Sequence, residues 1–118
     1  MLPGTRVFVV EDEALILLML EDYLLEIGCE VAGTAARLED ALEMARSISM
    51  DVAVLDVNLA GKVSYPVAEI LLKRNIPFLF ATGYGTAGLP AELRGFPVLS
   101  KPFLLDQLAK ALSVATGR

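Results

Sequence analysis

Four short apolar runs, each ending in a polar residue, constrain the fold of this 118-residue chain more than any other feature. They end at Glu11 and Asp12, at Asp56, at Thr82 and at Lys101. Continuous apolar runs of this length are typical of parallel strands that helices cover on both faces. Because the carboxyl ends of parallel strands meet at one edge of the sheet, such folds place their sites there. The sequence therefore predicts one pocket that contains carboxylates, a hydroxyl and an ammonium.

Alternating strand and helix patterns predict the fold class. Strands are expected at about residues 6–10, 30–34, 51–55, 77–81 and 96–99, and helices at about 13–27, 38–48, 64–74 and 104–115. Gly28 is a typical residue just past a helix end, and Ser64 followed by Pro66 is typical of a helix start. Because such crossovers are right-handed, we expect an α/β, flavodoxin-like, doubly wound sheet of five parallel strands in the order 2-1-3-4-5.

The segment between residues 83 and 95 is the weak element of this pattern. It contains four glycines and Pro90, and only residues 91–94 have a helix-forming composition. Each internal glycine costs ~1 kcal/mol relative to alanine in a helix. We therefore expect the fourth helix to be short or loop-like.

Composition narrows the class of protein further. The chain is 55% hydrophobic, carries a net charge of -5, and contains no histidine and one cysteine, Cys29. These values indicate one folded domain over residues 1–118 without an output domain, no direct nucleic-acid binding, no imidazole chemistry and no intrachain disulfide. The longest apolar stretch, Ala14 to Leu20, is far shorter than the ~20 residues of a membrane span. With no signal-peptide pattern at the amino terminus, the expected location is cytoplasmic, without membrane contact.

The acidic residues of the predicted pocket suit a divalent cation. Glu11, Asp12 and Asp56 would repel one another unless a cation relieves the repulsion, and magnesium prefers oxygen ligands. With magnesium beside it, Asp56 could attack a phosphorus centre and form an acyl phosphate. A simpler interpretation is that Glu11, Asp12 and Glu13 cap a helix, and for Glu13 we favour it. Asp56 alone would be an ordinary turn residue about half the time.

Thr82 and Lys101 complete the predicted pocket. The hydroxyl of Thr82 would donate to a phosphoryl oxygen, although a threonine at a strand end commonly bonds its own backbone. Lys101 would pair with Asp56 at rest and with a phosphoryl oxygen afterwards, the alternative being a solvated surface lysine. Pro102 favours the first interpretation, because an X-Pro bond adopts the cis form at low cost and a cis turn would aim the lysine into the pocket.

Together these residues resemble the CheY-like receiver domain of two-component response regulators, over nearly the whole chain. The resemblance implies that Asp56 accepts phosphate from a phosphohistidine on a histidine kinase or histidine phosphotransfer protein, and that a downstream protein partner follows. It also implies Mg2+ held by Asp12, Asp56 and the main-chain carbonyl of Asn58, with Glu11 acting mainly through water. Thr82 and Lys101 are the further catalytic residues that it implies.

The sequence departs from the family pattern at one position. Many members carry an aromatic switch residue three positions before the lysine, where this chain has Val98. Tyr84 is a candidate substitute that would cover the pocket, and the alternative is that it only packs the loop. The run from Pro77 to Tyr84 resembles the motif of the FAT-GUY group of single-domain receivers, which implies partners among the HWE and related histidine kinases.

The predicted first helix carries more leucine than one core-facing stripe requires. Leu17, Leu18 and Leu25 fall outside the stripe at helical spacing. One hypothesis is that they dock the helices of a partner or a second copy of the chain, giving a weak homodimer. The other is that this helix is more buried than usual.

The leading interpretation is a phosphoacceptor, not a turnover enzyme, that signals by protein–protein interaction or serves as a phosphate sink. One alternative is a receiver-shaped binding module that is never phosphorylated. Another is a phosphatase with an Asp nucleophile, but such enzymes need a second acid where this chain has Asn58. A flavodoxin-like nucleotide carrier is disfavoured because acids stand where its phosphate loop would lie.

Overall fold

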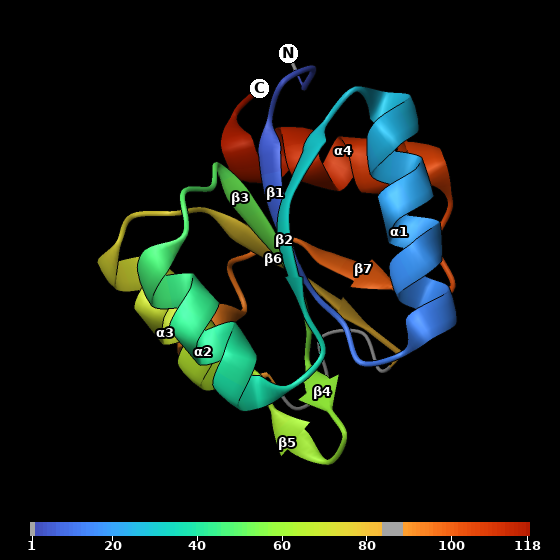
Figure 1. Cartoon of the computed structure of the whole chain (residues 1–118). Coiled ribbons are helices and arrows are strands. Elements are labelled where there is room, and N and C mark those ends of the chain that lie inside the picture. The colour runs from blue at the N-terminus through green and yellow to red at the C-terminus, as the bar shows by residue number, and fades with distance from the viewer. Residues whose placement is uncertain (1, 84–88) are drawn as a thin grey trace.

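The computed structural model describes residues 2–83 and 89–118. A sheet of five parallel strands in the order β2-β1-β3-β6-β7 forms the centre of the molecule (Figure 1). Its strands are β1 (Arg6–Val10), β2 (Glu30–Ala35), β3 (Val52–Asp56), β6 (Phe78–Thr82) and β7 (Val98–Ser100). This is the flavodoxin-like order expected from the sequence, so the predicted fold class is confirmed.

Helices cover both faces of the sheet, as the continuous apolar strands require. The helices are α1 (Ala14–Ile27), α2 (Leu38–Ser47), α3 (Tyr65–Lys73) and α4 (Leu105–Thr116). Alternate strand residues face opposite ways: Phe8 belongs to the core shared with α2 and α3, and Val9 to the core shared with α1 and α4. Figure 1 shows α2 and α3 together on one side of the sheet and α1 on the other.

The helix boundaries follow the signals in the sequence with one difference. Gly28 ends α1 in the left-handed conformation, with φ 93°. Ser64 occupies the position before α3, and Pro66 lies in its first turn. The position predicted for Ser64 at the start of this helix is therefore confirmed, although its side chain makes no capping hydrogen bond.

The weak segment after β6 contains little regular structure where it is described. Within residues 83 and 89–97, the described part of the segment, the one helical element is a 3-10 turn, η1 (Ala91–Leu93). Buried Leu89 and Leu93 attach this segment to the core shared with α2 and α3. The short fourth helix expected from the glycines is therefore confirmed.

Two features of the fold differ from the sequence-based expectation. A small antiparallel hairpin, β4 (Asn58–Leu59) with β5 (Lys62–Val63), follows β3 and has no counterpart in the prediction. On α1, Leu18 and Leu25 are exposed as expected, at 58% and 70%. Leu17 instead packs against the core, because helical spacing places it at the margin of the buried stripe.

Among the described residues, no helix is both long enough and apolar enough to cross a bilayer.

Candidate functional site

Strand register brings the predicted residues to one edge of the sheet. Val10 pairs with Leu55, which places the residues that follow β1 beside the end of β3. In the next pair along, Asp56 lies opposite Ala81 at the end of β6. All five predicted residues lie at or just beyond a strand end: Glu11 and Asp12 after β1, Asp56 at the end of β3, Thr82 at the end of β6 and Lys101 after β7. The spatial prediction is therefore confirmed, whereas the roles of these residues stay predictions.

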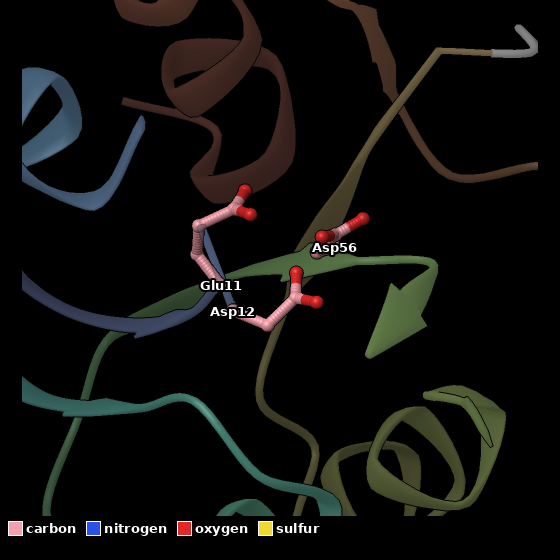
Figure 2. A group of neighbouring side chains, drawn as sticks. All are labelled: Glu11, Asp12 and Asp56. Carbon is pink, nitrogen blue, oxygen red and sulfur yellow. The ribbon is translucent and has the colours of Figure 1, made fainter. Parts of the chain in front are cut away.

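Three carboxylates meet at this edge. Glu11, Asp12 and Asp56 each offer an oxygen, and these oxygens lie within 4.8 Å of one another. Figure 2 shows Asp12, just after β1, reaching toward Asp56 at the end of β3. Glu11 and Asp56 are buried, while Asp12 is partly exposed. Two buried carboxylates beside a third carry a charge that the surroundings do not fully compensate.

Lys101 supplies the positive charge next to these acids. Its Nζ lies 2.9 Å from Oε1 of Glu11 and 3.3 Å from Oδ2 of Asp56. The sequence predicted a resting pair with Asp56 alone, so the pair with Glu11 is an addition. Burial opposes the charge of Lys101, yet its contacts with Glu11 and Asp56 outweigh burial and raise the pKa of the ammonium. The peptide bond from Lys101 to Pro102 is cis.

The ionisation of Asp56 is disfavoured in this environment. Burial, followed by the charge of Glu11, raises the pKa of Asp56 to about 7, although Lys101 acts in the opposite direction. A carboxyl with this pKa gains from any cation that enters the site. The chemistry of the cluster therefore fits a hard divalent ion with oxygen ligands.

An open cleft of about 370 Å³ borders two of the three carboxylates, those of Asp12 and Asp56. The residues that line it include Asp12, Asp56, Asn58, Thr82 and Lys101. Glu11 is not among the residues that line this cleft, and it is only 1% exposed. The main-chain N–H of Glu13 donates to Oε2 of Glu11 at 3.1 Å, so this carboxylate is held from two sides.

The hairpin after β3 contributes to the site through its backbone. The N–H of Ala60 donates to Oδ2 of Asp12 at 3.0 Å, and the N–H of Asn58 donates to Oδ1 of Asp56 at 3.3 Å. The sequence patterns do not predict this contribution. The only signal was Gly61, which allows the turn at the hairpin tip, where φ is 89°.

The position of the family's aromatic switch residue holds a small side chain. Val98 is half-buried in β7 and packs against the core shared with α2 and α3. Tyr84, the candidate substitute, lies outside the described residues.

Comparison with known proteins places these observations in a family. The chain matches the response regulator receiver domain over residues 7–113, and it belongs to this family. It is 32% identical to the transcriptional regulatory protein PdtaR of Mycobacterium tuberculosis, over 96% of this chain and 57% of that protein. It is 34% identical to the chemotaxis protein CheY of Thermotoga maritima, over 93% of this chain and 96% of that one.

Solved structures agree with the family assignment. The solution structure of SdrG from Sphingomonas melonis Fr1 superposes with a TM-score of 0.86 and 44% identity, over 98% of each chain. Family membership identifies this chain as a receiver domain of the response regulators, a class of signalling proteins. The chain spans just over half of PdtaR, 57% of its length, so what the whole of that protein does is not transferred.

Proposed function

We propose that this protein is a phosphoacceptor of a two-component phosphorelay, in which Asp56 receives a phosphoryl group from a phosphohistidine. The observation that carries the proposal is a buried Asp56 carboxylate that lines an open cleft, close to two other acids and 3.3 Å from Lys101. In the transfer, a carboxylate oxygen of Asp56 forms a bond to phosphorus while the bond from phosphorus to the imidazole nitrogen breaks. The histidine keeps the electron pair of that bond and takes up a proton.

The other residues of the cleft have distinct roles in this proposal. Lys101 leaves its pairs with Glu11 and Asp56 to neutralise a phosphoryl oxygen. The hydroxyl of Thr82, at the end of β6, donates to another phosphoryl oxygen. Both roles use groups that line the same cleft as the acceptor, so neither needs a large movement of the sheet.

The acidic cluster is the proposed magnesium site. Asp12, Asp56 and the main-chain carbonyl of Asn58 would hold Mg2+, with Glu11 acting mainly through water. The ion would neutralise charge on the phosphoryl group during its transfer. The pKa of Asp56, raised to about 7 by burial and by Glu11, supports this assignment because a nearby cation would favour the ionised acceptor.

Partners and location follow from the proposed chemistry. The phosphate donor is a histidine kinase or a histidine phosphotransfer protein, and the signal passes to a downstream protein or ends in hydrolysis. We propose a cytoplasmic location without membrane or nucleic-acid contact. Membership of the FAT-GUY group, and with it an HWE-type kinase, stays a prediction, as does the absence of an output domain.

A labelling experiment tests the proposed function. The protein is incubated with Mg2+ and a small phosphodonor such as acetyl phosphate, and its intact mass is followed over time. Wild type gains one phosphoryl group, and Asp56→Asn gains none. Asp51→Asn is the matched control, because Asp51 precedes the same strand at the opposite end. Labelling that persists in Asp56→Asn contradicts the proposal.

The exposed leucines of α1 provide a test of donor docking. Leu18 and Leu25 are replaced by glutamine, and transfer from a phosphorylated kinase is compared with labelling by acetyl phosphate. If this face docks the donor, only transfer from the kinase slows. Equal losses in both reactions count against docking, and a change in sedimentation alone favours a homodimer.

A further inference from the structure

The tip of the β4–β5 hairpin contacts the acidic cluster through main-chain groups. The N–H of Ala60 donates to Oδ2 of Asp12 at 3.0 Å, although the two residues are 48 positions apart. Asp12 follows β1 and the hairpin follows β3, so this hydrogen bond joins two loops beyond the end of the sheet. In Figure 2 the arrow of β4 lies close to the carboxylates of Asp12 and Asp56.

The tip is held in a conformation that the sequence does not favour locally. Ala60 has φ 51° and Gly61 has φ 89°. A left-handed alanine costs roughly 1–2 kcal/mol, so surrounding contacts must impose this backbone. One such contact is the hydrogen bond from the N–H of Gly61 to Oδ1 of Asn58, at 2.8 Å. The strained turn is what directs the N–H of Ala60 toward Asp12.

A main-chain N–H on a carboxylate is a common way to orient a metal ligand. Carboxylates that bind metals are usually hydrogen-bonded by neighbouring groups, and loss of such a partner weakens metal binding. Here the N–H groups of Ala60 and Asn58 each hold one oxygen, of Asp12 and of Asp56 respectively. The hairpin therefore restrains two of the three clustered carboxylates.

We propose that the β4–β5 hairpin positions Asp12 for a divalent cation, because the N–H of Ala60 fixes the orientation of its carboxylate toward Asp56. Ala60 is thus a positioning residue that acts through its backbone. The inference rests on the proposed magnesium site. Because coupling between two equilibria is reciprocal, a cation at the cluster also stabilises the hairpin tip.

Amide hydrogen exchange and Mg2+ titration of the 15N-labelled protein test this inference. Asn58→Ala removes the side-chain oxygen that holds Gly61 but keeps the main-chain carbonyl proposed as a ligand. Ala60→Pro removes the donor and, because proline cannot adopt a positive φ, the left-handed turn as well. Ala60→Gly is the matched control, because glycine keeps the N–H and adopts the left-handed backbone without cost. Amide signals of β1 and β3 report whether each variant keeps the sheet.

In wild type and in Ala60→Gly, Mg2+ is expected to slow the exchange of the N–H at position 60. Asn58→Ala and Ala60→Pro are expected to bind Mg2+ about tenfold more weakly. Equal affinity in all four proteins, or faster exchange at position 60 with Mg2+, overturns the role of the hairpin and leaves the magnesium site intact. If Mg2+ shifts no amide signal near Asp12 or Asp56 in wild type, the magnesium site fails, and the inference fails with it.

Discussion

The two ends of the parallel sheet carry different balances of charge. At the amino end, each acid has a basic partner: Arg6 lies 3.6 Å from Glu30, and Arg118 lies 3.7 Å from Asp51. Asp51 also accepts the main-chain N–H of Arg6 at 2.8 Å. At the carboxyl end, three carboxylates are clustered, and Lys101 pairs with two of them, Glu11 and Asp56.

The two ends also differ in how far their charged groups are buried, and burial determines how much an unpaired charge costs. The charged groups at the amino end are half-exposed, so water screens them and their pairing adds little stability. At the carboxyl end, Glu11 and Asp56 are buried, and uncompensated charge there costs folding free energy. Because a bound cation would offset this unfavourable free energy, the acidic cluster at the open edge of the sheet is a candidate cation site.

Among the changes that test this difference between the two ends, replacing Lys101 is expected to have the largest effect, on the rate at which Asp56 is labelled. Lys101→Met leaves the carboxylates without their ammonium and the transferring phosphoryl group without a neutralising partner. Labelling by acetyl phosphate at saturating Mg2+ should slow about 100-fold. Lys110→Met, on the exposed side of α4, is the control and should label at the wild-type rate. A Lys101→Met protein that labels normally would show that this lysine has no part in the transfer.

Matched aspartate substitutions at the two ends should change stability in opposite directions. The pKa of Asp56 rises from 3.8 to about 7 because of burial and Glu11. The folded protein therefore keeps a proton that the unfolded chain has lost, and the contribution of this group to stability falls as pH rises through about 4 to 7. In Mg2+-free buffer at pH 8, Asp56→Asn should be more stable than wild type by about 1–3 kcal/mol.

Asp51→Asn should instead be less stable by about 0.5–1 kcal/mol, because it loses the charge that pairs with Arg118. Urea unfolding at pH 5 and pH 8 measures both differences. The advantage of Asp56→Asn should shrink at pH 5, where wild-type Asp56 is largely protonated. An advantage that stays constant over this range contradicts the assigned cause.

Much of this site could be predicted from the sequence, because the carboxyl ends of all strands in a parallel sheet lie at the same edge. Asp12, Asp56 and Lys101 follow apolar runs, so the fold class alone brings them together. The pair between Lys101 and Glu11 was missed, because spacing does not show which of two adjacent acids a lysine contacts. Ala60 was missed because a left-handed alanine contradicts its local preference, and because local sequence does not indicate a hydrogen bond across 48 positions.

Metal addition is expected to have a smaller effect, confined to the acidic end. Mg2+ at ten times its dissociation constant should stabilise wild type by about 1.4 kcal/mol, and EDTA should reverse the gain. Asp12→Asn should lose most of this response, while Asp51→Asn should keep it. Thermal unfolding with and without Mg2+ measures the difference. A gain of equal size in Asp12→Asn would place the ion elsewhere.

The smallest effect on stability is expected at the amino end of the sheet, where the acids are paired with arginines. Arg118 is exposed, and its guanidinium contacts Asp51 and the hydroxyl of Thr5. Arg118→Ala should lower the free energy of unfolding by about 0.5 kcal/mol or less and leave labelling of Asp56 unchanged. Urea unfolding and intact-mass labelling of the same preparation provide both values. A labelling defect in this variant would show that the two ends of the sheet are coupled.

Anomalous scattering from crystals soaked in Mn2+ tests most directly whether the excess charge at the carboxyl end is a cation site. Mn2+ uses the same oxygen ligands as Mg2+ and gives a strong anomalous signal. One peak is expected, at about 2.0–2.3 Å from carboxylate oxygens of Asp12 and Asp56. Crystals that show no peak at these carboxylates, or a stronger peak at Asp51 and Glu30, would contradict this expectation.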